Sequence, residues 1–308
     1  TSIGGVWSSS NTAVATISPS GVVTGITAGN AVFSYTITNV NGCTNSATAA
    51  MTVNAGTTAT ISASGTTTFC AGGSVTLTAS SGSSYEWNTG SLNPSITVSA
   101  SGSYYVNVTN ALGCTATSVL TQVVVNPLPV VAAISGSTEV CIGNTTQLAN
   151  TTIGGVWSSS NNNIATVDAN GLVTSVTAGS TSITYTVTTA NGCTTSVSAV
   201  VNVNALPTAS ISANGATTFC AGGSVTLVAT TGTSYLWNNG QFTQSITVDT
   251  AGTYFTTVTN ASGCSANTNA ITVTVNALPT VVVTANGPTT FCQGNNVLLT
   301  ATGGTNYL

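Results

Sequence analysis

The sequence predicts an all-β protein, built as a tandem array of small β-sandwich domains that form a rod. Apolar and polar residues alternate in short segments such as 74–78, 95–98 and 182–187, which is the period of strands with one buried face. Asn-Gly pairs between such segments, as at 41–42 and 170–171, suit the tight turns that join strands. Eight cysteines and a short Leu-Pro string recur at nearly constant intervals, which indicates repeated modules.

The Leu-Pro strings mark the predicted domain boundaries. Val-Asn-Pro-Leu-Pro occupies 125–129, and Val-Asn-Ala-Leu-Pro occupies both 203–207 and 275–279. We therefore expect modules at 1–54, 55–129, 130–204, 205–279 and 280–308. Two module types follow one another in the order first, second, first, second, second. Because Pro fixes φ and the linkers are short, neighbouring modules should hold a preferred angle.

The first and last modules are shorter than the others. Residue 1 corresponds to residue 151, so 1–54 lacks the first strand or two of its type, and 280–308 stops before the Trp of its type. The expectation is a window cut from a longer repeat protein. The alternative is that the last half-module of one subunit completes the first half-module of the next, through a joint of two unlike types.

The cysteines predict one disulfide within each complete module. Cys70 with Cys114 and Cys220 with Cys264 each span 44 residues, and Cys141 with Cys193 spans 52. Closing loops of this size stabilises a fold by about 4 kcal/mol in the chain-entropy model. Pairing across modules, or free thiols at these six positions, would count against the boundaries. Cys43 and Cys292 lie in the short modules and are expected to be unpaired by truncation.

Disulfides place the protein outside the cytoplasm, in an oxidising extracellular or cell-surface setting. The alternative use of the cysteines, a zinc site, lacks both the Cys-x-x-Cys spacing and His.

The charge balance excludes several functions. The chain has no Lys, Arg or His and only four acids, Glu86, Glu139, Asp168 and Asp249. A hydrolytic triad has no base, the acids are scattered rather than paired, and calcium would want them clustered. Nucleic acid and anionic membranes have no cation to meet. No apolar run reaches the length of a membrane-spanning helix. We expect no enzyme activity, cofactor, metal, nucleic-acid partner or membrane insertion.

The aromatic residues are the remaining candidates for binding. Each of the four tryptophans takes an equivalent place in its repeat, where a sandwich buries a core side chain; they are Trp7, Trp87, Trp157 and Trp237. The alternative is that they stack on sugar rings. Tyr104 and Tyr254 follow Gly-x near the start of a late strand, as in a tyrosine corner.

The two module types resemble known families. The first type, in 152–174 and again in 2–24, carries Trp-Ser-Ser-Ser-Asn, Ala-Thr-Val or Ala-Thr-Ile, and Gly-Leu-Val-Thr or Gly-Val-Val-Thr. It resembles bacterial Ig-like group 2 domains. The second type, with Phe-Cys-Ala-Gly-Gly-Ser-Val at 69–75 and 219–225, resembles PKD/Ig-like repeats of large secreted Bacteroidota surface adhesins or filaments.

The resemblance implies an Ig-like sandwich fold for the whole array. It also makes Thr250 a candidate for O-glycosylation, because Asp249-Thr250-Ala251 matches a pattern that Bacteroidota use.

The predicted function is structural: the shaft of an extracellular bacterial filament or giant surface adhesin. The expected partners are other copies of the chain, because no Lys guards the edges of its sheets. The alternative is an adhesive or glycan-binding module array on the cell surface.

Overall fold

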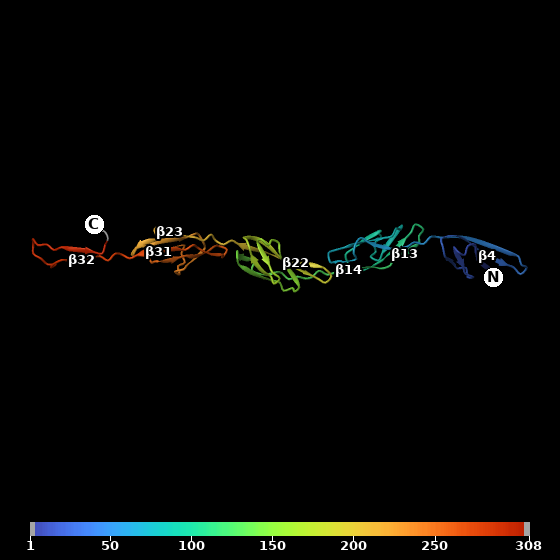
Figure 1. The fold of residues 1–308 in the computed structure, drawn as a ribbon. Helices are drawn as coiled ribbons and strands as arrows, with labels where there is room; N and C mark the ends of the chain where they lie inside the picture. The colour runs from blue at the N-terminus through green and yellow to red at the C-terminus, as the bar shows by residue number, and fades with distance from the viewer. Residues whose placement is uncertain (1–3, 305–308) are drawn as a thin grey trace. The chain divides into compact units, whose positions relative to one another are not determined.

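A computed structural model describes residues 4–304, and the described residues contain strands and turns but no helix. The all-β prediction is confirmed. No helix long and apolar enough to cross a membrane occurs among them. They form two compact units, residues 4–130 with 188–195, and residues 131–187 with 196–304. Figure 1 shows the strands gathered into successive groups along the chain.

In the first unit, residues 4–54 form one three-stranded and one two-stranded sheet. The larger sheet has the order β1-β4-β5 and the smaller pairs β2 with β3. The strands are β1 (Val6–Ser9), β2 (Ala15–Ile17), β3 (Val23–Gly25), β4 (Gly29–Thr38) and β5 (Thr44–Val53). Their small core centres on Phe33, Ala15 and Ala31.

Residues 61–126 of the same unit form three sheets around a larger core. The orders are β10-β8-β6, β11-β14-β7 and β13-β12-β9. The strands are β6 (Ile61–Ala63), β7 (Thr68–Cys70), β8 (Val75–Ala79), β9 (Ser84–Trp87), β10 (Ser95–Val98), β11 (Gly102–Tyr104), β12 (Val106–Thr109), β13 (Thr115–Thr117) and β14 (Thr121–Asn126). Trp87 and Leu77 are among the most buried members of the core.

Residues 135–204 form two four-stranded sheets, with orders β15-β17-β20-β19 and β16-β22-β21-β18. The strands are β15 (Ser135–Gly136), β16 (Glu139–Cys141), β17 (Thr145–Ala149), β18 (Gly155–Ser159), β19 (Ala165–Val167), β20 (Leu172–Ser175), β21 (Gly179–Thr188) and β22 (Thr194–Asn204). Leu148 and Val173 of one sheet join Ile183 and Val201 of the other in one buried cluster. Two sheets facing a shared core make a sandwich.

Residues 211–276 repeat the arrangement of 61–126, with orders β23-β25-β27, β24-β31-β28 and β26-β29-β30. The strands are β23 (Ile211–Asn214), β24 (Thr218–Cys220), β25 (Val225–Ala229), β26 (Ser234–Trp237), β27 (Ser245–Val248), β28 (Gly252–Tyr254), β29 (Thr256–Thr259), β30 (Ser265–Asn267) and β31 (Ile271–Asn276). One antiparallel pair follows, β32 (Val282–Ala285) with β33 (Leu299–Thr302).

Each of the four clusters of buried residues draws its members from a single predicted module. The module boundaries themselves stay a prediction.

The last strand of each larger group pairs in parallel with a short strand that ends in cysteine. Cys70 lies opposite Asn126, Cys141 opposite Asn204, and Cys220 opposite Asn276. This register brings the cysteine to the point where the chain leaves the group. We call Cys70, Cys141, Cys220 and Cys292 the early cysteines.

The other four cysteines end a tight turn between two antiparallel strands. In the turn 110–114 the Asn110 Oδ1 accepts hydrogen bonds from the backbone N–H of Leu112 and of Cys114, both at 3.0 Å. Gly113 has a φ of 82°, which glycine adopts without strain. We call Cys43, Cys114, Cys193 and Cys264 the late cysteines.

Candidate functional site

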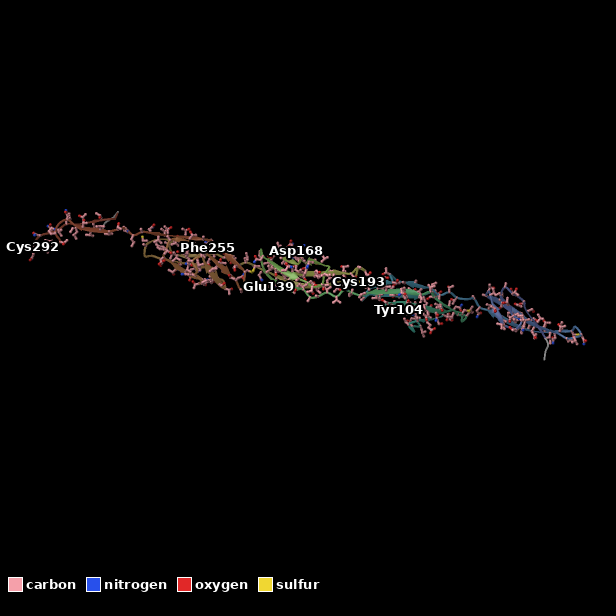
Figure 2. The ribbon with its side chains drawn as sticks, turned by 90° about the horizontal axis from the view of Figure 1, so that it is seen from below. Tyr104, Glu139, Asp168, Cys193, Phe255 and Cys292 are labelled. Atoms are coloured by element: carbon pink, nitrogen blue, oxygen red, sulfur yellow. A yellow bond between two sulfur atoms is a disulfide. The ribbon has the colours of Figure 1, made fainter. Side chains whose placement is uncertain are left out.

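The structure joins an early cysteine to the late cysteine of the next predicted module. Its disulfides are Cys70–Cys193 and Cys141–Cys264, each with a sequence separation of 123 and a Cα–Cα distance of 5.6 Å. The predicted pairs Cys70–Cys114, Cys141–Cys193 and Cys220–Cys264 are therefore wrong. This pairing across modules counts against the predicted module boundaries, whereas the four clusters of buried residues each fall within one predicted module. Cys114 and Cys220 are free among the described residues, as are Cys43 and Cys292. Figure 2 labels Cys193 and Cys292 along the chain.

The prediction failed because the two cysteines of one module lie at different ends of it. Cys70 lies beside Asn126, where the chain leaves residues 61–126. The turn that carries Cys114 lies where the chain enters them, since Asn110 Nδ2 donates to the carbonyl oxygen of Ala55 at 3.0 Å. A disulfide cannot span that separation without backbone movement.

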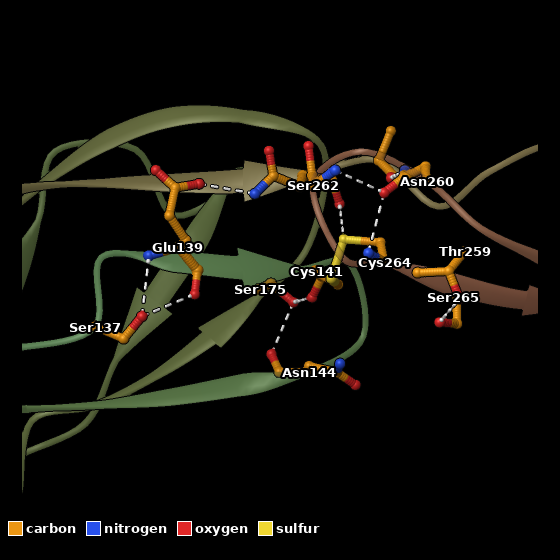
Figure 3. Close-up of a disulfide and its surroundings, with 12 residues drawn as sticks. Ser137, Glu139, Cys141, Asn144, Ser175, Thr259, Asn260, Ser262, Cys264 and Ser265 are labelled. Carbon is orange, nitrogen blue, oxygen red and sulfur yellow. Dashed lines mark hydrogen bonds between the residues drawn. A yellow bond between two sulfur atoms is a disulfide. The ribbon is translucent and has the colours of Figure 1, made fainter. Parts of the chain in front are cut away.

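The Cys141–Cys264 junction is surrounded by polar contacts, which Figure 3 shows. The Ser175 hydroxyl, largely buried, donates to the carbonyl oxygens of Cys141 at 2.9 Å or Asn144 at 2.8 Å. On the other side, Asn260 Nδ2 donates to the carbonyl oxygen of Ala205 at 2.9 Å. Cys264 itself is 1% exposed. The turn and the strand are thus fixed on both sides of the sulfur atoms.

Glu139, in the strand that carries Cys141, completes this junction. Its carboxylate accepts hydrogen bonds from Asn202 Nδ2 and Asn204 Nδ2, both at 2.7 Å. The hydrogen bonds from Asn202 and then Asn204 lower the pKa of Glu139 below its usual range. The charged form therefore ties β16 to the end of β22.

The Cys70–Cys193 junction uses a related set of contacts. Asn191 Nδ2 donates to Asn126 Oδ1 at 3.0 Å, and the backbone N–H of Cys193 donates to Thr189 Oγ1 at 3.1 Å. The Sγ atom of Cys193 lies 4.0 Å from the carbonyl oxygen of Asn126. The Sγ atom of Cys264 lies 3.9 Å from the carbonyl oxygen of Asn204, so the two junctions have the same arrangement.

Sequence reasoning overlooked the asparagines that position these cysteines. Asn126 and Asn204 end the last strands, and Asn110 and Asn260 open the turns. A signal was present in the spacing. Within a predicted module the two cysteines are 44 or 52 residues apart. The separation between an early cysteine and the late cysteine of the next module is 123 residues in both cases.

The four tryptophans fall into two classes. Trp87 and Trp237 are 2% and 1% exposed, and their Nε1 atoms donate to the carbonyl oxygens of Asn93 and Thr243. Trp7 and Trp157 are half-buried at the edge of their cores.

Each half-buried tryptophan packs against a tyrosine. Trp157 packs on Tyr185 with ring centroids 4.7 Å apart, and Trp7 packs on Tyr35 at 4.8 Å. A Cβ atom at Gly171 would lie 3.1 Å from the Trp157 ring, so this glycine also covers it. A shallow hollow is lined by Trp157 and Tyr185 together with Asn150 and Asn170, so stacking of a sugar on Trp157 stays an alternative.

The remaining predicted positions are placed as follows. The hydroxyls of Tyr104 and Tyr254 donate to the carbonyl oxygens of Ala100 and Thr250, both at 3.0 Å, which is the geometry of a tyrosine corner. Thr250 is exposed, with its Oγ1 2.9 Å from the Tyr254 hydroxyl. Its O-glycosylation stays a prediction. Within residues 4–304, no three acidic or cysteine side chains gather as a metal site would require.

Comparison with known proteins gives one family and several solved structures. The family described as bacterial Ig-like domain (group 2) matches residues 119–198. The comparison with curated proteins gave no match.

Among solved structures, the chain is similar to a Ca²⁺-stabilized adhesin with which an Antarctic bacterium binds ice. That likeness has 17% identity and a TM-score of 0.32, and covers 89% of this chain and 90% of the adhesin. A 1.5-MDa bacterial ice-binding adhesin is similar at 19% identity and a TM-score of 0.24, with 71% and 98% covered. Domains 3–5 of Drosophila OTK are similar at 12% identity and a TM-score of 0.29, with 68% and 93% covered.

Proposed function

We propose that this chain is a structural segment of an extracellular bacterial surface protein, the shaft of a filament or of a giant adhesin. The observation that carries the proposal is the pair of disulfides, each of which joins cysteines of consecutive predicted modules. A bond within a module stabilises only that module, whereas a bond between modules also limits their movement against each other. Such a bond suits a spacer that must transmit force.

The chemistry of the chain supports the same function. It has no Lys, Arg or His, so the nitrogen bases that most general acid–base catalysis uses are lacking. Disulfides persist in oxidising surroundings, which supports an extracellular location. The family match at 119–198 supports a bacterial Ig-like array, and the resemblance of the second module type supports a Bacteroidota source. Other copies of the chain and surface glycans remain the proposed partners.

Antibody labelling of intact cells tests the location and the function together. Antibodies raised against residues 55–279 should decorate unpermeabilised cells and thin fibres or a fringe around them. Labelling that appears only after permeabilisation would contradict the proposal. Amine-reactive surface labels are unsuitable, because the chain has no Lys.

Single-molecule stretching tests the mechanical part. With both disulfides closed, the fully extended chain should be much shorter than after reduction, because each bond hides part of a 123-residue loop from the force. A variant with Ser at Cys70, Cys141, Cys193 and Cys264 should extend fully without reductant. Equal extension of both proteins would contradict a role for the disulfides under load.

A further inference from the structure

A hollow of about 560 Å³ lies on one face of the sheet β13-β12-β9. Trp87 pairs with Val106, and both side chains are buried, so this pair faces the core. The next pair along the two strands is Glu86 with Asn107, and it faces the opposite side because side chains alternate along a strand. Glu86 and Asn107 both line the hollow, whose volume falls in the range of small-molecule sites.

The strand side of the hollow offers both acceptors and donors of hydrogen bonds. Asn107 Oδ1 accepts from Thr117 Oγ1 at 2.7 Å, which leaves Asn107 Nδ2 toward Glu86 Oε2, 3.5 Å away. The hydroxyls of Thr109 and Thr115 lie 2.9 Å apart. Because only one of these two can donate to the other, the second hydroxyl hydrogen is available to a ligand.

Apolar side chains line the hollow from the segment that joins β9 to β10. They are Leu92, which is 70% exposed, and Pro94. Trp87 fixes this segment, since its backbone N–H donates to the carbonyl oxygen of Ser91 at 2.8 Å and its Nε1 to that of Asn93 at 2.9 Å. The apolar groups are therefore held beside the polar ones before any ligand arrives, which lowers the entropic cost of binding.

Glu86 is a carboxylate that the fold leaves accessible. Glu139 accepts two hydrogen bonds at 2.7 Å, and Asp168 accepts two at 2.8 Å, all from neighbouring parts of the chain. Glu86 is exposed, and within residues 4–304 its one hydrogen bond is the long contact with Asn107 at 3.5 Å. Its oxygen atoms are therefore available to a ligand.

The equivalent face of residues 211–276 shows that the fold does not need this pair. There Leu236 pairs with Thr257 in the register that Glu86 and Asn107 have. Thr257 donates to Asn267 Oδ1 at 2.7 Å, so the Asn–Thr hydrogen bond is kept while the amide lies on the edge strand β30. A carboxylate and an amide side by side are thus a property of the first of these two faces and not a requirement of the sheet.

A closed disulfide junction leaves this face uncovered. In residues 211–276, where Cys264 is bonded, Thr259 is half-buried and Ser265 is exposed. Thr109 and Thr115 have the same positions in the sheet and the same exposure. The hollow therefore does not depend on whether the nearby cysteine is bonded.

We propose that this hollow binds a neutral sugar unit of a glycan. Two adjacent sugar hydroxyls donate to the Glu86 carboxylate, Asn107 Nδ2 donates to a further sugar oxygen, and Leu92 and Pro94 pack against C–H groups of the ring. The negative charge of Glu86 excludes anionic sugars, and the amide hydrogens beside it disfavour a cation. The proposed structural segment thereby gains a defined site for its proposed glycan partner.

Nuclear magnetic resonance of the 15N-labelled 308-residue chain tests the proposal. The probes are the methyl glycosides of glucose, galactose and mannose. At least one should bind with a Kd on the order of 1 mM, as expected for a single sugar unit, and should shift the Asn107 side-chain amide and the backbone N–H signals of 84–86. Tetrahydropyran, a ring without hydroxyls, and n-butylammonium should not shift them.

Three variants localise the binding. Glu86→Gln should raise the Kd by roughly tenfold, because a charged acceptor is lost. Glu86→Leu with Asn107→Thr, the residues found at 236 and 257, should abolish binding while the circular dichroism spectrum stays unchanged. Asp249→Asn removes one carboxylate outside the hollow and should bind like the unaltered chain.

The proposal is overturned if none of the three glycosides shifts these signals, or if E86Q and D249N have equal Kd values. Tighter binding of n-butylammonium than of any glycoside at the same signals would replace the sugar with a cation and would overturn it too. None of these results would change the surface labelling or the extension under force, so they are distinct from a failure of the structural function.

Discussion

At the scale of single residues, the tryptophans of the two module types differ in burial and in contacts. Trp87 and Trp237 of the second type are core residues with their N–H groups satisfied. Trp7 and Trp157 of the first type close the edge of a core beside a tyrosine. The recurrence of Trp predicts a core position for all four, because such a pattern carries no information about how many neighbours surround each ring.

The tryptophan classes predict different costs of truncation. Trp237→Ala should lower the free energy of unfolding by about 3–5 kcal/mol, because it empties a fully buried site. Trp157→Ala should lower it by less, since this ring is half-buried. Chemical denaturation measures both, with Phe242→Ala, whose ring is 70% exposed, as the control that should change little. A larger loss for Trp157→Ala would contradict the two classes.

Two carboxylates predict how stability depends on pH. The pKa of Asp168 is lowered chiefly by the backbone N–H of Leu172, which donates to Oδ1 at 2.8 Å, and that of Glu139 is lowered by Asn202 and Asn204. A lowered folded-state pKa gives stability that is complete above roughly pH 5 and is lost as the pH falls through that lowered value.

The melting temperature should therefore be nearly constant from about pH 5 to 9 and fall below about pH 4. The double variant Glu139→Gln with Asp168→Asn should show a weaker fall in acid. Thermal melts followed by tryptophan fluorescence measure this. A steep change between pH 5 and 9 would show that another group titrates with folding.

At the scale of elements, the alternation of apolar and polar residues predicts where strands lie but not which strands pair with each other. The alternating segment 95–98 is β10 (Ser95–Val98), and 182–187 lies inside β21 (Gly179–Thr188). The parallel pairing of β7 with β14 and of β16 with β22 left no trace in the alternation. Because these pairings set where Cys70 and Cys141 lie, the cysteine pairs could not be predicted from the module pattern alone.

Peptide mapping without reductant checks the pairing directly. A protease that cuts after large apolar residues should release linked peptides containing Cys70 with Cys193 and Cys141 with Cys264. Thiol labelling before digestion should mark Cys43, Cys114, Cys220 and Cys292. Linked peptides with Cys70 and Cys114 would restore the pairing within modules.

At the scale of the whole molecule, the two disulfides enclose overlapping stretches of chain, 70–193 and 141–264. A single Lys substitution tests the first of these stretches, because the chain has no Lys or Arg and trypsin will cut only there. Ala111→Lys lies inside the first stretch, and Val40→Lys lies at the equivalent place of another turn, outside both. After trypsin, A111K should run as one band in a denaturing gel until reduced, whereas V40K should separate at once. Separation of A111K without reductant would contradict the Cys70–Cys193 disulfide.

The overlap has a consequence for damage. From Cys70 to Cys264 the chain offers two separate covalent routes, one through the first disulfide and 193–264, the other through 70–141 and the second disulfide. Any one peptide bond between these residues can be broken while at least one route survives. This part of the protein is therefore redundant in the engineering sense. One cut or two leave it continuous, because the two disulfides are also joined to each other through 141–193. Severing it takes three cuts, one each in 70–141, 141–193 and 193–264, or one cut in 70–141 together with reduction of the first disulfide.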